Sequence, residues 1–338
     1  MRCFVAPAFC WTGRQAFLRV FPARSSYAVD MSVREADVCR VIIDNNTKGR
    51  SIEMKRTLCF GLAVLLGLGC FTIAAAEAEK PVILVVSFGT SYNDSRDITI
   101  GAIEEDVQAA YSDYEVRRAF TSQIIIDRLK ERDGLEIDNV TEAMDKLVQD
   151  GVKELYIQPT HVMKGFEYDD VVAEVAPYQD KFDVFKMGDP LLTHIEDYEA
   201  VTKALLSDNE FVGSEDTAIV YMGHGTEHSY NAAYSQMEAV MQARGYDNVF
   251  IGTVESFPTI EDVIAKVTAF GAEKVVLYPF MVVAGDHANN DMAGGEEDSW
   301  NTLLEEAGFE VECKIQGLGQ NEGIRSIYVE HLKVAMEG

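Results

Sequence analysis

The feature that most constrains the fold is an apolar run that ends in a glycine–histidine–glycine turn. Residues 218–222 read Ala-Ile-Val-Tyr-Met, and Gly223-His224-Gly225-Thr226 follows directly. A β-branched apolar run of this length is typical of a strand buried on both faces, as in a parallel sheet. The flanking glycines let the chain turn sharply and leave the His224 imidazole uncrowded. Ligands bind at the carboxyl ends of such strands, so His224 is well placed to meet a metal ion or a proton.

From residue 81 onward, short apolar segments alternate with longer amphipathic ones. In the first half the pattern predicts strands at residues 82–87, 114–120, 153–158 and 182–187. It predicts helices at residues 94–111, 123–131, 140–150, 168–176 and 197–206. Strands that alternate with helices in this way are typical of βαβ units around a parallel sheet, so the predicted fold class is α/β.

The second half of this region repeats the landmarks of the first. Ser87-Phe-Gly-Thr90 corresponds to Gly223-His-Gly-Thr226, and each motif closes an apolar strand. A proline and a glycine at 159 and 165 return at 279 and 285, a displacement of 120 positions in both cases. We therefore predict an internal duplication, with an N-terminal α/β half at residues 77–207 and a C-terminal α/β half at residues 208–338. Their strand ends would line a shared cleft, where ligands preferentially bind.

The first 76 of the 338 residues do not follow this pattern. Residues 54–76 have a basic start, an apolar middle and a small-residue end, which is the order of a secretory signal peptide cleaved after Ala76. The apolar part is too short and too rich in glycine for a membrane span. We interpret residues 1–53 as a mis-called extension upstream of a true start at Met54, with a disordered leader as the alternative. The expected location is the periplasm.

Without residues 1–76 the chain is strongly acidic. That segment holds 10 of the 29 Lys and Arg residues and 5 of the 56 Asp and Glu residues, which leaves 19 against 51 and a formal charge of −32. So acidic a body repels nucleic acid and anionic lipid, and it attracts cations. Cys313 is the one cysteine after residue 76, so neither an intrachain disulfide nor a thiolate metal cluster is expected. Any metal would be bound by His, Asp or Glu.

Two histidines stand at strand ends, one in each half. His161 follows the third strand of the first half, and its counterpart in the repeat is Met281. His224 follows the first strand of the second half, and its counterpart is Phe88. Non-equivalent imidazoles are expected if a pseudo-symmetric cleft is specialised to hold one central object. The alternative, that each histidine is a structural cap on its strand, stays open.

Carboxylates follow other strands at the same edge. Asp189 ends the fourth strand and should point into the cleft, and Glu255 follows the strand predicted at residues 248–252. Each is a candidate metal ligand or proton acceptor. Two imidazoles and a carboxylate suit Co²⁺, Fe²⁺, Ni²⁺ or Zn²⁺, and the order of metal affinities does not by itself select cobalt.

The remaining candidates lie beside these strand ends. His287 is framed by Asp286 and Asp291, which could orient its ring and make it a proton carrier; a capped helix N-terminus is the alternative. Surface or capping roles are expected for the other histidines, at 194, 228 and 331. Aromatic and methionine residues near the loops would line a flat apolar pocket, with core packing as the alternative for each: Phe88, Tyr92, Met163, Phe166, Tyr230 and Met281.

At these residues the sequence resembles the anaerobic (class II) sirohydrochlorin cobaltochelatases of cobalamin synthesis, the CbiK family, which are similar in fold to ferrochelatases. The resemblance covers residues 80–335. It is carried by six motifs: Ser87-Phe-Gly-Thr90, Gln158-Pro-Thr-His-Val162, Met222-Gly-His-Gly-Thr226, Val254-Glu-Ser-Phe-Pro258, Val283-Ala-Gly-Asp-His-Ala-x-Asn-Asp-Met292 and Gly317-Leu-Gly-x-Asn321.

The resemblance implies two Rossmann-like halves, each with a four-stranded parallel sheet, that clasp a tetrapyrrole. It implies insertion of Co²⁺, with Fe²⁺ as an alternative metal, into sirohydrochlorin without a nucleotide. The family's metal-binding histidines fall on His161 and His224, and Asp189 is placed as the third metal ligand by position. One histidine would accept the pyrrole protons, and Asp189, Glu255 and His287 would pass them on. Because these tasks need neutral imidazole, activity should fall in acid.

The signal peptide implies an exported form of this family. Some exported members are haem-binding tetramers whose haem ligand lies early in the first half, and this also makes a homo-oligomer an expectation. Residues 77–160 contain no histidine, which argues against haem at that place. A periplasmic carrier of metal or tetrapyrrole without turnover is the alternative function. A nucleotide-binding protein and a serine hydrolase are disfavoured, because no G-x-G-x-x-G, P-loop or G-x-S-x-G motif is present.

Overall fold

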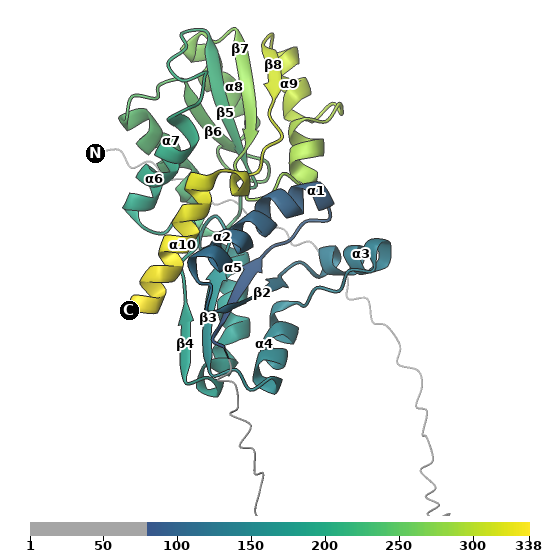
Figure 1. Cartoon of the computed structure of the whole chain (residues 1–338). Coiled ribbons are helices and arrows are strands. Elements are labelled where there is room, and N and C mark those ends of the chain that lie inside the picture. Colours follow the sequence, from purple (N-terminus) through teal and green to yellow (C-terminus); the bar gives the residue numbers. More distant parts are fainter. Residues whose placement is uncertain (1–79) are drawn as a thin grey trace, which may run out of the picture. The chain divides into compact units, whose positions relative to one another are not determined.

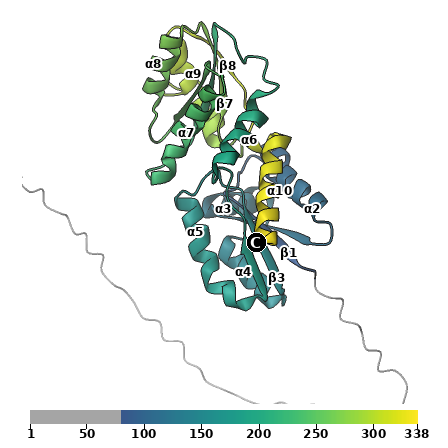
Figure 2. The same cartoon turned by 90° about the vertical axis from the view of Figure 1, so that its left-hand side faces the viewer.

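Two parallel four-stranded sheets form the framework of residues 80–338, the part of the chain that this computed structural model describes (Figures 1 and 2). The first sheet has the order β2 (Glu115–Phe120), β1 (Val82–Ser87), β3 (Glu154–Pro159) and β4 (Val184–Met187). The second has the order β6 (Val249–Thr253), β5 (Thr217–Gly223), β7 (Lys274–Pro279) and β8 (Glu310–Cys313). The identical order confirms the predicted α/β class and the repeated architecture. The predicted extension (1–53) and signal peptide (54–76) lie outside the described residues.

Ten α-helices accompany these strands within residues 80–338. They are α1 (Asn93–Arg96), α2 (Ala102–Ala110), α3 (Gln123–Asp133), α4 (Val140–Gln149), α5 (Phe166–Val175), α6 (Ile195–Leu206), α7 (Ala232–Ala243), α8 (Ile260–Phe270), α9 (Trp300–Glu306) and α10 (Glu322–Glu337). Several begin at side chains that cap the first turn. Asn139 forms a capping box with Glu142 at α4, and Thr259 forms one with Asp262 at α8. Such caps satisfy backbone N–H groups that have no partner within the helix.

The helix predicted over residues 94–111 is not continuous. A π-helical turn at Asp97–Gly101 separates α1 from α2. At this turn the Thr99 hydroxyl donates to the Ser95 carbonyl, and Gly319 from the second half approaches closely. A Cβ on Gly319 would lie 2.9 Å from Thr99 Cβ, so only glycine fits there without a shift. The helical periodicity of the sequence does not predict this contact, because it is made with a residue far away in the chain.

Alternate residues of the central strands face two different cores. In β1, the side chains of Val82 and Leu84 pack against α4 and α5, whereas Ile83 and Val85 belong to a cluster on the other face. All of them are fully buried, which explains why the strand reads as a continuous apolar run. In the second sheet, β5 is buried along its whole length in the same way.

The largest core cluster extends across both halves. It joins residues of β1 and β5 to apolar side chains of α6, α7 and α10, among them Val201, Met237 and Tyr328. Helix α10 leaves the second half and packs on β3, β4 and α2, so the last element of the chain covers the first sheet (Figure 1). The predicted boundary between contiguous halves stays a prediction. No helix in residues 80–338 combines the length and the apolar character that a membrane span requires.

The surface role expected for His331 is wrong, because its side chain is buried under α6. Its Nε2 lies 2.9 Å from Asp197 Oδ1, and its Nδ1 lies 3.1 Å from the Asp189 carbonyl oxygen. Burial opposes the charge on His331, but the hydrogen bond and charge of Asp197 outweigh it and raise the pKa of His331. Burial likewise opposes the charge on Asp197, and the contacts with His331 and the backbone N–H groups lower its pKa.

This pair predicts a pH-dependent stability. Because folding raises the pKa of His331, its charged form stabilises the fold fully below about pH 6.5, the pKa of histidine in the unfolded chain. This stabilisation is lost as the pH rises through the pKa of His331 in the folded protein. Because folding lowers the pKa of Asp197, its carboxylate stabilises the fold above about pH 3.9, the pKa of aspartate in the unfolded chain. This stabilisation is lost as the pH falls through the pKa of Asp197 in the folded protein. We expect His331→Gln to reduce the free energy of unfolding by on the order of 2 kcal/mol at pH 6, which lowers the melting temperature by a few degrees. The loss should be smaller at pH 9 in thermal unfolding followed by circular dichroism. An equal loss at both pH values would contradict a charged pair.

Candidate active site

A cavity of about 410 Å³ lies where the carboxyl ends of the central strands of both sheets meet. Residues that follow β1, β3, β5 and β7 line it. The structure brings together here seven residues predicted from the sequence: Phe88, Tyr92, His161, Met163, His224, Met281 and His287. Their common location follows from the parallel strands, because the carboxyl ends of neighbouring parallel strands meet at one edge of a sheet.

Two glycines with left-handed backbone conformations shape the loops at this edge. Gly89 has a φ of +100°, and a Cβ there would lie 2.6 Å from the Phe120 ring. Gly225 has a φ of +88°, and a Cβ there would lie 2.9 Å from the backbone nitrogen of Ser256. A side chain at either position would meet both backbone strain and a clash. These turns bring Phe88 and His224, the residues that precede the two glycines, to the wall of the cavity.

His161 contributes a neutral imidazole to the cavity. The hydroxyl of Thr160 donates to Ser87 Oγ at 2.8 Å, and Tyr328 of α10 donates to the Thr160 carbonyl at 2.9 Å, so the backbone before His161 is fixed. Both ring nitrogens are buried, and neither has a hydrogen-bond partner among the described residues. Burial lowers the pKa of His161 to about 4, against the opposing charge of Glu167. The ring is therefore neutral at pH 7 and keeps a lone pair for a cation.

On the second half, His224, Glu255 and His287 offer ligand atoms that all lie within 4.8 Å of one another. The His224 and His287 rings meet edge to face with their centroids 4.7 Å apart. The Glu255 carboxylate lies 3.7 Å from His224 Nδ1. Imidazole and carboxylate groups together suit divalent transition metals. The chain thus places a second set of possible metal ligands beside the cavity that His161 lines.

Hydrogen bonds assign the tautomers of these two imidazoles. His224 Nδ1 lies 2.7 Å from the Gly225 carbonyl oxygen, which can only accept, so Nδ1 carries the proton and Nε2 keeps the lone pair. His287 Nδ1 lies 2.6 Å from Asp291 Oδ2. A carboxylate in this position orients a histidine and makes its other nitrogen a better ligand. The pairing expected between His287 and its flanking aspartates is therefore made through Asp291.

The expectation that Asp189 points into the cleft is wrong. Its Oδ1 lies 2.7 Å from Lys164 Nζ and its Oδ2 lies 3.1 Å from His194 Nε2, and it does not line the cavity. Burial opposes its charge, but the bonds to Lys164 and His194 outweigh it and lower the pKa of Asp189. These partners hold the Asp189 side chain outside the cavity lining. Glu255 is the carboxylate that approaches a cleft histidine, and the catalytic and metal roles of all these residues stay predictions.

The aromatic residues divide between the cavity and its surroundings. Tyr92 lines the cavity and donates its hydroxyl to Asp286 Oδ1 at 3.3 Å, while Met163 is buried in the wall. Phe166 and Tyr230 instead pack around the His228 ring, with centroids 4.9 and 5.6 Å away. They therefore belong to the rim of the site and not to its lining.

Sequence reasoning missed two charged residues that line the cavity, Arg128 and Glu167. Arg128 lies on α3, and Glu167 is in the first turn of α5. On the sequence each is one of several charges on an amphipathic helix, a pattern that usually marks a solvated face. No local signal distinguishes them, because their position depends on how α3 and α5 pack beside the strand ends.

The fold defines the class of protein. Among solved structures, SirB from Bacillus subtilis with Fe³⁺ matches with a TM-score of 0.51 at 14% identity, over 76% of this chain and 95% of that one. A multi-domain protein from Deinococcus radiodurans, described as similar to chelatases, also matches with a TM-score of 0.51, at 12% identity, over 75% of this chain and 55% of its own. At these identities the likeness shows a chelatase-type fold.

Sequence comparison then shows the family. The family described as cobalt chelatase (CbiK) matches residues 81–337. A sirohydrochlorin cobaltochelatase of Salmonella typhimurium is 38% identical over 257 residues, 76% of this chain and 97% of the relative. The sirohydrochlorin cobaltochelatase CbiKC of Nitratidesulfovibrio vulgaris is 32% identical over 259 residues, 76% of this chain and 91% of the relative. The protein belongs to the CbiK family of cobalt chelatases, as its motifs predicted.

The state of His161 can be measured directly. We expect nitrogen chemical shifts in ¹⁵N-histidine-labelled protein to show His161 protonating near pH 4, well below the usual histidine value of about 6.5. Comparison with His161→Gln assigns the resonance. A His161 titration at or above about pH 6.5 would contradict the burial of its ring nitrogens.

Proposed function

We propose that the protein inserts Co²⁺ into a sirohydrochlorin-type tetrapyrrole. The observation that carries this proposal is that one cavity is lined by His161, whose ring nitrogens are buried, and by His224 and His287, which form a ligand cluster with Glu255. Family membership and the names of the two relatives support the same activity. The cation is a substrate of this reaction and not a resident cofactor. Fe²⁺ is the second metal we propose, because the same ligands accept it.

Insertion exchanges one divalent cation for two protons. The metal binds the ring nitrogens as the two pyrrole N–H protons leave, so a base must lie close to the ring. We infer that His161 and His224 hold the metal in turn and that one of them accepts protons. Within residues 80–338 the His161 ring nitrogens have no hydrogen-bond partner, and the His224 Nε2 keeps its lone pair. Both observations support this assignment, since neutral imidazole can do either task. Apolar wall residues such as Phe88 and Met163 would contact the faces of the ring.

The second half supports a route for the released protons. His224 lies beside Glu255 and His287, and the latter pairs with Asp291. Both Glu255 and Asp291 are partly exposed, with side-chain exposures of 55% and 42%, so protons can leave to water from either carboxylate. On the His161 side the ring nitrogens are buried. We therefore infer that protons leave through the second half.

Substitution of the two histidines tests the assignment. His161→Ala and His224→Ala should each reduce the rate of Co²⁺ insertion into sirohydrochlorin by about a hundredfold or more, because general base catalysis alone contributes about that much. The absorbance change of the macrocycle on metallation measures the rate. Unchanged circular dichroism would show that the fold is intact.

His194→Ala is the matched control, because His194 is exposed and lies outside the cavity. It should keep the wild-type rate. Wild-type rates in both His161→Ala and His224→Ala would remove these residues from the mechanism. If the wild-type protein binds the tetrapyrrole and Co²⁺ but the rate never exceeds that of the uncatalysed reaction, the protein is a carrier and not a chelatase.

We also propose that the protein is exported to the periplasm. The support is the order of basic, apolar and small residues in 54–76, together with the acidic body that follows. Expression of the full reading frame with fractionation should place the protein in the periplasm with a mature N-terminus at Glu77 by intact-mass analysis. A cytoplasmic protein that keeps residues 54–76 would show that this segment is not a cleaved signal.

A further inference from the structure

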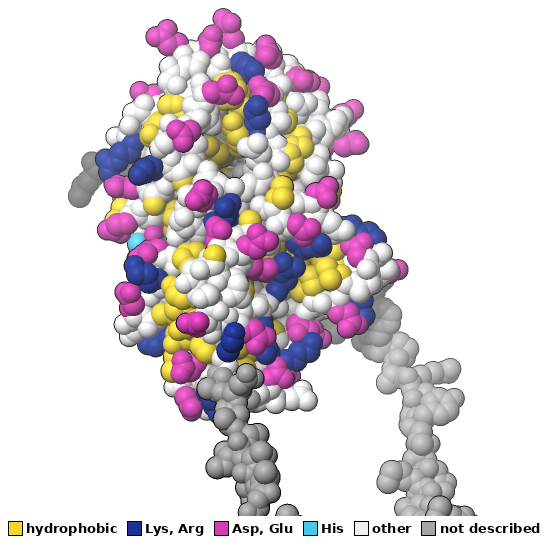
Figure 3. Space-filling model, in the orientation of Figure 1, with side chains coloured by type: hydrophobic (Ala, Val, Ile, Leu, Met, Phe, Trp, Pro, Cys, Tyr) yellow, Lys and Arg dark blue, Asp and Glu magenta, His cyan; other side chains and the backbone are white. Residues whose placement is uncertain are grey.

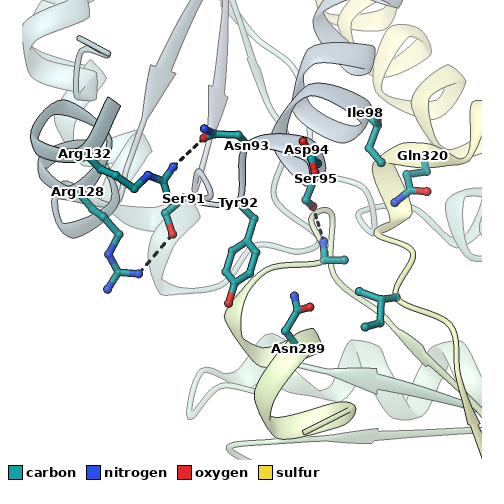
Figure 4. A pocket seen from close by; sticks show the side chains of 12 residues that line it. Ser91, Tyr92, Asn93, Asp94, Ser95, Ile98, Arg128, Arg132, Asn289 and Gln320 are labelled. Atoms are coloured by element: carbon teal, nitrogen blue, oxygen red, sulfur yellow. Dashed lines mark hydrogen bonds between the residues drawn. The ribbon is translucent and has the colours of Figure 1, made fainter. Parts of the chain in front are cut away.

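A second pocket, of about 580 Å³, adjoins the active-site cavity (Figure 4). It lies between the chain segment that begins α1, one side of α3, and loops of the second half that include Asn289 and Gln320. Ser91, Tyr92 and Arg128 line both this pocket and the cavity that holds the histidines. Arg128 therefore lies at the boundary between the proposed metal site and a polar space beside it.

The ionic contacts of Arg128 set it apart from the other arginines. Residues 80–338 contain seven arginines, and the other six each form an ion pair with a carboxylate. Arg128 forms none within this part of the chain; its Nη1 donates to Ser91 Oγ at 3.3 Å. A guanidinium carries five N–H donors in a planar fork that matches a carboxylate. Most of these donors are therefore left for a ligand.

The neighbours of Arg128 hold the pocket in shape without neutralising it. One turn along α3, Arg132 pairs with Asp133 and donates to Asn93 Oδ1 at 2.8 Å. Figure 4 shows Arg128 and Arg132 side by side at one end of the pocket, with Asp94 away from Arg128 beyond Tyr92. Dark blue side chains are also visible around α3 among the magenta ones (Figure 3). The pocket thus has a positive end.

The charge of the protein makes such an end necessary for an anionic substrate. Residues 77–338 carry a formal charge of −32, so their field repels polyanions. Sirohydrochlorin carries acetate and propionate groups around its ring, all ionised at neutral pH. The Arg128 guanidinium at the edge of the cleft offsets this repulsion beside the cavity. A bidentate contact with a carboxylate would also fix the orientation of the ring.

We propose that Arg128 binds a peripheral carboxylate of the tetrapyrrole in this second pocket. The inference rests on the proposed function, and it adds the group that recognises the edge of the substrate. Because Arg128 and the cleft histidines line one continuous cavity, a ring whose centre faces His161 and His224 can extend a carboxylate past Tyr92 to the guanidinium. Arg128 thereby acts in binding and orientation, and the cleft histidines act on the metal.

Metal-free ligands separate this role from catalysis. The probes are uroporphyrin, which carries eight carboxylates, and its neutral octaamide, and binding is followed by quenching of intrinsic fluorescence. Arg128→Met keeps the length of the side chain and removes its charge. It should weaken uroporphyrin binding by about tenfold or more, the effect of one charged hydrogen-bonding contact, and leave octaamide binding unchanged. Arg128→Lys keeps the charge but loses the planar fork of donors, so its affinity for uroporphyrin should lie between those of the wild type and Arg128→Met.

Two controls make the result specific. Arg244→Ala removes an exposed arginine that follows α7 and is paired with Glu199 of α6, and this variant should bind both probes as the wild type does. Calorimetry with Co²⁺ alone should give the same affinity for Arg128→Met and the wild type. If Arg128→Met binds uroporphyrin as tightly as the wild type, the carboxylate site is refuted while the chelatase function stands. If the wild-type protein binds neither probe, the proposed function fails together with this inference.

Discussion

The structure depends on one apolar core that spans both sheets. It joins β1 and β5 through α6, α7 and α10, and it contains the fully buried Tyr328 and Met237. Because protein interiors are close-packed, this core fixes the position of one sheet against the other. The strand ends of both halves therefore meet at a defined distance. A cavity lined by both halves is the direct result, and α10 links that core to the site through the hydrogen bond from Tyr328 to the carbonyl before His161.

The two walls of the cavity have different electrostatic characters. On the first half, burial alone keeps His161 neutral, since neither ring nitrogen has a partner among the described residues. On the second half, His224 is 40% exposed and lies beside the Glu255 carboxylate. A duplicated fold would give similar walls if its residues had stayed equivalent. The two walls therefore differ: the His161 ring nitrogens are buried, whereas His224 is partly exposed beside a carboxylate.

Charge acts at two scales in this protein. At long range the acidic body attracts divalent cations and opposes anionic substrates. At short range, Arg128 lines the edge of the cleft and has no carboxylate partner among residues 80–338, whereas Lys164 is paired with Asp189. The local arrangement of cations, and not the net charge, decides where a tetrapyrrole with many carboxylates can bind. Net charge describes solubility and long-range attraction, whereas recognition requires particular side chains at the site.

The sequence by itself determined the class of fold and the edge of the sheets at which the site lies. The strand at residues 82–87 and the Gly-His-Gly turn after β5 could be predicted because period, apolar content and glycine are local properties. The partners of Asp189, the burial of His331, the π-helical turn at Asp97–Gly101 and the location of Arg128 could not. Each depends on contacts between residues far apart in the chain. Only tertiary packing decides which carboxylate pairs with a lysine, which imidazole has its nitrogens buried, and which arginine of residues 80–338 forms no ion pair.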